Sequence, residues 1–282
     1  MSICCPICIQ SRTEFLFKKC NFDIYKCTSC GLGMTDIPSD FDLLSIYNED
    51  YFQGKQVDGY ADYIGSESVL RKEFHRDVNL LLSQVEHKTK KPRLLDIGSA
   101  YGFFLEEAKE YFEVQGLEVA AEAVAFSKKR GLQVTEGILD STNAAQIGKF
   151  DVVTFLDVIE HVPNPNEFFQ NIDKITHKGS KILLTTGNFG SLFSRITGKY
   201  WRLMTPPQHA YFYTRKSLID LLKSHGFEVD LIVSPSKIVP IDLIFFQVSR
   251  ILGFRIKTPR FLKNRDIKVN LFDTLKIVAS KV

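Results

Sequence analysis

The sequence predicts an α/β protein in which a parallel, doubly wound sheet follows a small cysteine-rich module. From residue 93 onward, short apolar runs typical of buried strands alternate with segments of helical periodicity. Such alternation is typical of strand–helix–strand units, whose helices cover both faces of a parallel sheet. All six cysteines, by contrast, lie within the first 30 residues. We therefore expect two different kinds of structure in one chain.

Length and composition fit an ordinary globular protein. The 282 residues suffice for one large domain or two small ones, and 44% of them are hydrophobic and 24% charged. A net charge of +3 is too small to predict nucleic-acid binding, which usually requires a dense basic patch. No apolar run reaches the roughly 18–20 residues of a membrane span, and the N-terminus does not resemble a secretory signal. We expect a cytoplasmic protein.

Each strand of the predicted sheet is a short apolar run. "RLLDIG" (93–98) has the composition of a buried strand, "EVQGLEV" (113–119) ends near Glu118, and "LQVTEG" (132–137) is shorter. "KFDVVTFLDVIEHV" (149–162) begins as a strand. The remaining strands are expected at 180–187, 227–234 and 274–280. Sheets of this kind bind ligands at the carboxyl ends of their strands.

Helices are expected between these strands. "GFFLEEAKEYF" (102–112) is rich in helix formers, and "AAEAVAFSKKRG" (120–131) stops at a glycine. "PNEFFQNIDKITHKG" (165–179) has proline in its first turn, where a missing N–H is tolerated. Another helix is expected at 215–226. Before the sheet, residues 68–87 carry apolar residues close to helical spacing, namely Val69, Phe74, Val78, Leu81 and Leu82.

The cysteines form two C-x2-C pairs with 18 residues between them. Two such pairs at this separation are typical of a tetrahedral thiolate zinc site, and the aromatic and apolar residues between them alternate as in a zinc ribbon. The predicted zinc ligands are Cys5, Cys8, Cys27 and Cys30. Four protein ligands would make this zinc structural. The alternatives are reduced thiols without metal, or a redox or iron site. Cys4 could replace its neighbour as ligand, and Cys20 is left over.

These patterns divide the chain into three parts. Residues 1–40 contain the predicted ribbon. Residues 41–90 are expected to be helical, and their tyrosines (Tyr47, Tyr51, Tyr60 and Tyr63) are candidates for a lid. Residues 91–282 contain the alternating sheet, with an insertion at 238–262 before the last strand. Within it, residues 238–257 have the pattern of an amphipathic helix with a basic end. We favour a cover or dimer contact for this helix over contact with a membrane surface.

The turn after the first strand of the sheet contains Gly98, Ala100 and Gly102, preceded by Asp96. It is neither the G-x-G-x-x-G dinucleotide fingerprint nor a P-loop. Glu118 lies 22 residues after Asp96 at the end of the second strand, where an acid can accept hydrogen bonds from both ribose hydroxyls. No basic cluster for phosphates lies near the turn. A cationic nucleoside without phosphate fits these residues, and S-adenosylmethionine is such a molecule.

With these motifs the sequence resembles class I S-adenosylmethionine-dependent methyltransferases. The resemblance covers nearly the whole chain. "LLDIGSAYGFFL" resembles the family's first motif, with Ala100 where glycine is more usual. "GLEVAAEAVAFSKKRG", "FDVVTFLDVIEHVPNP" and "KGSKILLTTGN" resemble its later strands. The ribbon, joined through "YNEDYF", makes the chain similar to bacterial sugar C-methyltransferases and polysaccharide-cluster methyltransferases.

This resemblance implies a Rossmann-like methyltransferase sheet that binds S-adenosylmethionine. Asp96 would face the cationic amino-acid end of the cofactor and Glu118 its ribose. Asp157 would lie near the adenine and methionine, and Leu139 and Asp140 would border the adenine. The glycines of the turn would let the backbone approach the cofactor closely. The expected cofactor-binding residues are Asp96, Gly98, Ala100, Gly102, Glu118 and Asp157.

Three side chains are candidates for catalysis. His161 follows the fourth strand before a proline turn, and an imidazole with a pKa near neutrality would suit a general base. Glu160 could orient it or bind the acceptor. His209, in "TPPQHAYFY", is a second candidate for the base, and its aromatic neighbours could line an acceptor pocket or belong to the core. His161 could instead only pack or bind cofactor.

The expected function is methyl transfer to a small acceptor, a sugar or nucleotide-sugar of polysaccharide or secondary metabolism. Because "DVIEHVPNP" also resembles quinone-pathway O-methyltransferases, a quinone or lipid precursor is the alternative acceptor. A third reading is an inactive zinc-ribbon scaffold. We expect no nucleic-acid partner, and the methylated atom (oxygen, nitrogen or carbon) is left open.

Overall fold

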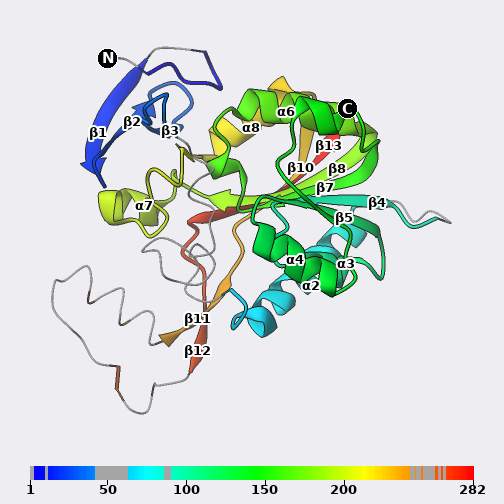
Figure 1. The fold of residues 1–282 in the computed structure, drawn as a ribbon. Helices are drawn as coiled ribbons and strands as arrows, with labels where there is room; N and C mark the ends of the chain where they lie inside the picture. Colours follow the sequence, from blue (N-terminus) through cyan, green and yellow to red (C-terminus); the bar gives the residue numbers. More distant parts are fainter. Residues whose placement is uncertain are drawn as a thin grey trace.

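The computed structural model describes residues 3–9, 12–41, 63–85, 90–241 and 265–282, together with the single positions 245, 249, 258, 259 and 262. Within these residues, seven strands form one sheet, four form a second near the N-terminus and two form a small antiparallel sheet (Figure 1). Helices lie on both faces of the larger sheet. The predicted α/β fold with a central parallel sheet is thus confirmed.

The larger sheet has the strand order β10-β13-β8-β7-β4-β5-β6. Its parallel part comprises β4 (Arg93–Ile97), β5 (Glu113–Glu118), β6 (Val134–Glu136), β7 (Phe150–Leu156) and β8 (Thr176–Gly187). β13 (Thr274–Lys281) runs antiparallel to both β8 and β10 (Phe227–Val233). A wholly parallel sheet was therefore the wrong expectation at this edge. The segment between β10 and β13 returns to the sheet at the end where β10 leaves it, and β13 therefore runs in the opposite direction to β10.

Helices cover the sheet where the sequence alternates. Figure 1 shows α2 (Glu67–Leu82), α3 (Phe103–Ala108) and α4 (Ala121–Lys129) on one face, and α6 (Pro165–Ile175) and α8 (Arg215–Ser224) on the other. The short helix α5 (Ser141–Ala144) follows β6. Asn164 caps α6 by accepting a hydrogen bond from the backbone N–H of Glu167. A single 3-10 turn, η2 (Ile159–His161), follows β7.

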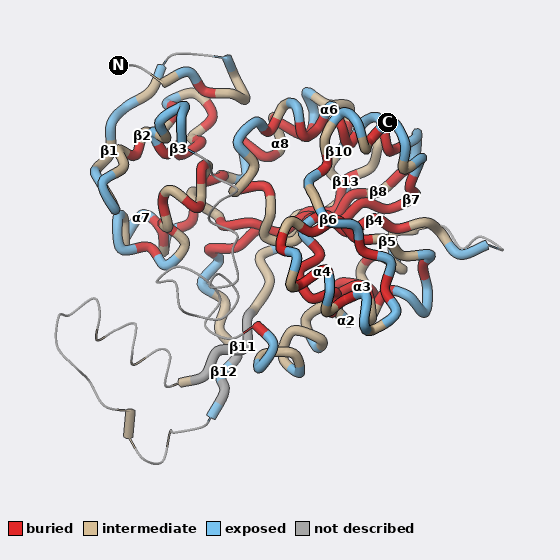
Figure 2. Tube along the Cα trace, viewed as in Figure 1, coloured by how far each residue is buried: buried red, intermediate tan, exposed pale blue. Residues whose placement is uncertain are grey.

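The core lies between the central strands and these helices. Val152 and Val153 of β7 are fully buried, as are Ile182, Leu183 and Leu184 of β8. Successive residues of a strand point to opposite faces, so burial of neighbours means that both faces are covered. Figure 2 shows the same pattern, with buried strands inside and exposed segments on the outer helices.

The N-terminal module is a small antiparallel sheet. β1 (Thr13–Lys19) pairs with β2 (Phe22–Cys27), and β2 pairs with β3 (Gly33–Thr35). The fourth strand is β9 (Tyr211–Phe212), which lies far along the sequence from the other three and pairs with β3. The module is therefore joined to the larger part of the protein by backbone hydrogen bonds.

The insertion before the last strand differs from expectation at its first residues, whereas the described positions 241, 245 and 249 are helical, as predicted. β11 (Lys237–Pro240) pairs with β12 (Asp266–Val269), so the amphipathic helix predicted from residue 238 does not begin there. Two β-branched residues followed by a proline favour extended backbone over helix. Nearly all the rest of 238–257, and the candidate lid residues Tyr47, Tyr51 and Tyr60, lie outside the described residues. Within the described part of the chain, no helix is long and apolar enough to cross a membrane.

Candidate functional site

Two adjoining cavities open at the carboxyl ends of β4, β5 and β7. Their volumes are about 280 and 290 Å³, and both are lined by Tyr63, Gly98, Leu156 and Asp157. The first cavity extends along Glu118 and the segments after β6 and β7, whereas the second extends toward α2 and β13. Shared lining residues place the two cavities side by side, as needed for a ligand that reaches from one into the other.

The turn from β4 to α3 lies between the two cavities, and its Gly98 lines both. Gly98, Ala100 and Gly102 all have positive φ angles, of 71°, 46° and 77°. A Cβ atom on Gly98 would lie 2.6 Å from a methyl carbon of Val158, so this position requires glycine. Ala100 has a backbone conformation that favours glycine. Gly98 is exposed and lines both cavities, so a ligand can approach its backbone, whereas Gly102 lines neither and a Cβ there would meet Leu132.

Glu118 holds this turn in place from the end of β5. Its carboxylate accepts hydrogen bonds from the backbone N–H of Ala100 at 2.7 Å and from that of Ala120 at 2.9 Å. The side chain is buried and lines the first cavity. Burial raises the pKa of Glu118, and the backbone hydrogen bonds oppose that rise. The remaining lone pairs of the carboxylate are suited to a ligand that donates hydroxyl groups.

The other end of the first cavity is formed after β6 and β7. Leu139 and Asp140 line it, and the Asp140 side chain caps α5 by accepting from two backbone N–H groups. Ile138 and Phe168 add apolar surface. A flat apolar ring with a ribose directed at Glu118 fits this lining.

Asp96 lines the second cavity and is almost fully buried. It accepts a hydrogen bond of 2.6 Å from the Thr154 hydroxyl. Burial, helped by the charge of Glu118 and opposed by the Thr154 hydrogen bond, raises the pKa of Asp96 to about 7. A carboxyl held at this pKa is ionised more readily when a cation comes next to it.

Asp157 lies where the two cavities meet. It has a positive φ of 56° directly after β7, and its carboxylate accepts a hydrogen bond of 2.9 Å from the Thr185 hydroxyl. Thr185 lines the second cavity and was not predicted from sequence, although its place at the end of a parallel strand is a usable signal.

The three candidate catalytic residues lie together although His209 is distant in sequence. The rings of His161 and His209 are in edge contact, with centroids 4.7 Å apart. One ligand atom of each histidine and of Glu160 lie within 4.8 Å of one another. This donor set could hold a divalent cation as well as transfer a proton.

Both imidazoles are oriented by backbone carbonyl groups. Nδ1 of His161 lies 2.9 Å from the carbonyl oxygen of Gln208, and Nδ1 of His209 lies 2.8 Å from that of Leu203. Because a carbonyl can only accept, each Nδ1 carries the hydrogen and each Nε2 a lone pair. Burial lowers the pKa of His161 to about 4 and also lowers that of His209. The expected near-neutral pKa of His161 is therefore not found, because burial disfavours the imidazolium.

The second cavity also contains charged residues that sequence reasoning missed. Asp77 of α2 forms a buried ion pair with Lys276 of β13, and Glu73, Arg76 and Ser236 also line the space. Asp77 is an acid on the buried face of an amphipathic helix, which is a sequence signal. Its partner comes from a strand 199 residues later, which no local pattern reveals.

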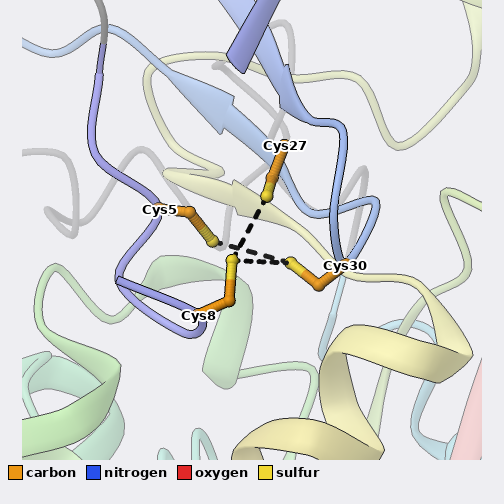
Figure 3. Close-up of side chains that lie close together, drawn as sticks. All are labelled: Cys5, Cys8, Cys27 and Cys30. Atoms are coloured by element: carbon orange, nitrogen blue, oxygen red, sulfur yellow. Dashed lines mark hydrogen bonds between the residues drawn. The ribbon is translucent and has the colours of Figure 1, made fainter. Parts of the chain in front are cut away.

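The paired cysteines converge in the N-terminal module (Figure 3). Sγ of Cys5 lies 3.5 Å from that of Cys30, and Sγ of Cys8 lies 3.3 Å from that of Cys27. Disulfide sulfurs would be about 2 Å apart, whereas thiolates around tetrahedral zinc are roughly 3.8 Å apart given Zn–S bonds of about 2.3 Å. The four sulfurs thus fit a metal better than disulfides. The other cysteines, Cys4 and Cys20, are exposed and remain outside this cluster.

Hydrogen bonds join β3 of the N-terminal module to the segment that carries His209. Thr35 of β3 donates its hydroxyl to the carbonyl of His209 at 2.7 Å and its N–H to the carbonyl of Ala210 at 2.9 Å. Ala210 in turn donates its N–H to the carbonyl of Glu160 at 2.9 Å. The segment that carries His209 is therefore held between the N-terminal module and η2.

The comparison with known families decides the class of protein. A family model described as "Methyltransferase domain" matches residues 68–232, more than half of the chain. The chain belongs to this methyltransferase family. The matched residues include the glycine turn, Glu118, Asp157, His161 and His209, whereas Tyr63 and Lys276, which line the cavities, lie outside the match.

The chain is also similar to curated methyltransferases and to solved methyltransferase structures. Ubiquinone biosynthesis O-methyltransferases of Xanthomonas oryzae and Pectobacterium atrosepticum are 29% and 31% identical over 103 residues, which span 34% of this chain and 43% of theirs. An Archaeoglobus fulgidus SAM-dependent methyltransferase has a TM-score of 0.54 at 20% identity, covering 78% of this chain and all of its own. Magnesium protoporphyrin IX methyltransferase of Synechocystis with bound SAH has a TM-score of 0.53 at 14% identity, covering 85% and 98%. Family and fold together support S-adenosylmethionine as the cofactor.

Proposed function

We propose that this methyltransferase transfers a methyl group to a small hydroxylated acceptor, a sugar or nucleotide-sugar. The observation that carries the proposal is the lining of the second cavity, where acids, bases and hydroxyls stand beside the cofactor turn. Polar groups in such number suit an acceptor with many hydroxyls, because buried polar groups need partners. The ion pair of Asp77 with Lys276 would present both charges to such a molecule.

Residues of both cavities would hold the cofactor. Glu118 would accept hydrogen bonds from its ribose, Asp96 would face its cationic amino group, and the turn with Gly98, Ala100 and Gly102 would lie against it. Asp157, where the cavities meet, would lie near the sulfur. When bound, S-adenosylmethionine supplies an electrophilic methyl group on its sulfonium. Holding the acceptor oxygen in line with it is worth about 7–11 kcal/mol when the geometry is close to attack.

His161, which lines the first cavity and not the second, would take the proton of an acceptor hydroxyl that reaches from the second cavity to the junction at Asp157. Its low pKa keeps the imidazole neutral at pH 7, with the lone pair on Nε2. A base of this strength is too weak to deprotonate a sugar hydroxyl beforehand, so the proton would move as the methyl group is transferred. Glu160 and His209 would orient His161 and stabilise the imidazolium that forms.

The cysteine cluster would bind one structural zinc ion. Cys5, Cys8, Cys27 and Cys30 supply four thiolates, which close the coordination sphere and leave no position for substrate. The metal would then act on the reaction only through the structure of the module.

A second candidate acceptor is a phenolic quinone precursor. It is favoured by the names of the relatives, which match a third of this chain at 29–31% identity. The charged second cavity favours the sugar instead.

Calorimetric titration with S-adenosylmethionine and S-adenosylhomocysteine is the first test. Micromolar binding of both is expected, followed by methylation of nucleotide-sugars in a panel that also contains catechol-type phenols. Transfer to the phenols alone would replace the sugar by the second candidate. Absence of cofactor binding by the folded, zinc-loaded protein would refute the proposed methyl transfer. An inactive zinc-ribbon scaffold would then be the remaining interpretation.

A further inference from the structure

One helix of the protein presents apolar side chains to solvent. α7 (Leu192–Thr197) is followed by the 3-10 turn η3 (Gly198–Tyr200). Leu192 and Ile196 lie one helical turn apart and are 73% and 74% exposed, and Tyr200 is 64% exposed. We call these three side chains the α7 stripe. They are among the most exposed large apolar residues in the described part of the chain.

The opposite side of the same helix is already packed. Phe193 contacts a buried cluster that includes Trp201 and Phe212, and the Ser194 hydroxyl is bonded to the backbone of Phe189 at 2.6 Å. The helix is therefore held on the body of the protein by one side while the α7 stripe faces outward. Figures 1 and 2 show α7 at the periphery, next to β1.

Cations border the stripe. Arg195 and Lys199 are exposed, and Lys199 lies over the ring of Tyr200 at 5.3 Å. Lys19 of β1 reaches the carbonyl of Lys199 at 2.8 Å and adds a positive charge. The sequence from 188 to 219 contains no aspartate or glutamate. An apolar stripe with Arg195 and Lys199 on its own segment and Lys19 beside it is complementary to an anionic lipid surface, where apolar side chains enter the acyl boundary and cations meet headgroups.

The stripe lies at the end of the sheet where the cavities open. Four residues separate the end of β8 at Gly187 from the start of α7, and Thr185 of β8 lines the second cavity. A membrane on the α7 stripe would thus face the same end of the protein as the cofactor turn.

We propose that the α7 stripe and its bordering cations dock the protein on the surface of an anionic lipid bilayer. The inference concerns binding alone and does not depend on which acceptor the methyltransferase uses. Docking through so few side chains is reversible and requires both the apolar and the charged contribution.

The test is co-sedimentation with vesicles of equimolar phosphatidylglycerol and phosphatidylcholine, compared with vesicles of phosphatidylcholine alone. The unmodified protein should bind the anionic vesicles, and less so as salt rises. Leu192→Glu/Ile196→Glu should lower the partition coefficient about tenfold or more, and Arg195→Glu/Lys199→Glu should lower it about tenfold and remove its salt dependence.

Tyr111→Glu is the matched control, because Tyr111 is also exposed but lies before β5, at the opposite end of the sheet. It should bind as the unmodified protein does. All changes are at exposed positions, and unchanged melting temperatures will show that each variant folds. A Tyr200→Trp variant should give blue-shifted emission with anionic vesicles only.

Two results would overturn the proposal. One is equal vesicle binding by the unmodified protein and Leu192→Glu/Ile196→Glu, including no binding by either. The other is a dimer in sedimentation velocity that the same double variant abolishes while vesicles bind neither form, since a second copy of the chain would then cover the stripe.

Discussion

At the scale of single residues, Glu118 has two tasks that can be separated. Its carboxylate accepts from two backbone N–H groups and also lines the first cavity. Glu118→Gln keeps the size but replaces one acceptor oxygen by a donor, so the cofactor or the turn loses a charge-assisted hydrogen bond. We expect weaker S-adenosylmethionine binding by about 1.5–3 kcal/mol, which is roughly 10- to 100-fold in Kd by calorimetry.

Glu136→Gln is the control for this change. Glu136 is the residue of β6 paired in register with Glu118, but it is exposed and lines neither cavity. Its substitution should leave Kd unchanged. Equal Kd values for Glu118→Gln and the unmodified protein would remove Glu118 from the ribose site.

Asp96 should make cofactor binding depend on pH. Its pKa is raised to about 7 by burial, so it is largely protonated in the cofactor-free protein below pH 7. A cationic amino group prefers the ionised form, and binding then requires loss of that proton. The Kd of S-adenosylmethionine should rise above about pH 8, where the α-amino group of the ligand loses its charge, and should rise toward tenfold per pH unit below about pH 6, where Asp96 is protonated. Calorimetry across this range tests it, and Asp96→Asn should bind weakly with no rise on the acid side.

At the scale of elements, the turn from β4 to α3 predicts opposite effects at two neighbouring positions. Gly98→Ala adds a Cβ at positive φ against Val158, so we expect a loss of about 1–3 kcal/mol in the free energy of unfolding. Ala100→Gly relieves a positive φ and should be neutral or stabilising by up to about 1 kcal/mol. Urea unfolding of both variants measures this. A Gly98→Ala variant as stable as the parent would show that the turn adapts to a side chain.

The elements also show what local sequence can predict. The strands from β4 to β8 are apolar runs bounded by turn residues, and they were predicted within a few residues. β9 was not, because two residues within "HAYFY" show no periodicity, and their strand character depends on pairing with β3. β8 begins at Thr176, inside the segment predicted as helix 165–179, because it pairs with Phe150 of β7.

The candidate site follows the same division. Asp96, Glu118 and Asp157, which line the cavities, can be selected from the sequence because each lies at or near the end of a strand of the parallel sheet. Contact between His161 and His209, and the ion pair of Asp77 with Lys276, depend on how distant segments pack. No single-sequence pattern contains that information.

At the scale of the whole molecule, the N-terminal module is hydrogen-bonded to the segment 209–214, which carries His209. Thr214 donates its hydroxyl to the carbonyl of Cys30 at 3.0 Å, and Asn166 donates its amide to the carbonyl of Pro6 at 2.7 Å. β9, between His209 and Thr214, completes the module's sheet. The cofactor turn, in contrast, belongs to the larger sheet. Loss of the module should therefore affect the two halves of the site differently.

Removal of the proposed zinc is the sharpest test of that difference. Without metal the four thiols lose their common partner, β3 loses its support, and the segment with His209 is released. We expect methyl transfer to fall at least about tenfold, because misplacing a catalytic group costs rate steeply. Calorimetric binding of S-adenosylmethionine should change no more than about threefold, since the proposed cofactor residues Asp96, Glu118 and Asp157 lie on β4, on β5 and directly after β7 of the larger sheet. Cys27→Ser should reproduce the effect, whereas Cys20→Ser, at an exposed cysteine outside the cluster, should keep one zinc by atomic absorption and full activity. Thr35→Val should keep the zinc but lower kcat, because it removes only the hydroxyl that donates to the carbonyl of His209.

A zinc-free protein with unchanged kcat would show that the module does not affect catalysis. A parallel loss of cofactor binding would show that the module supports the whole fold.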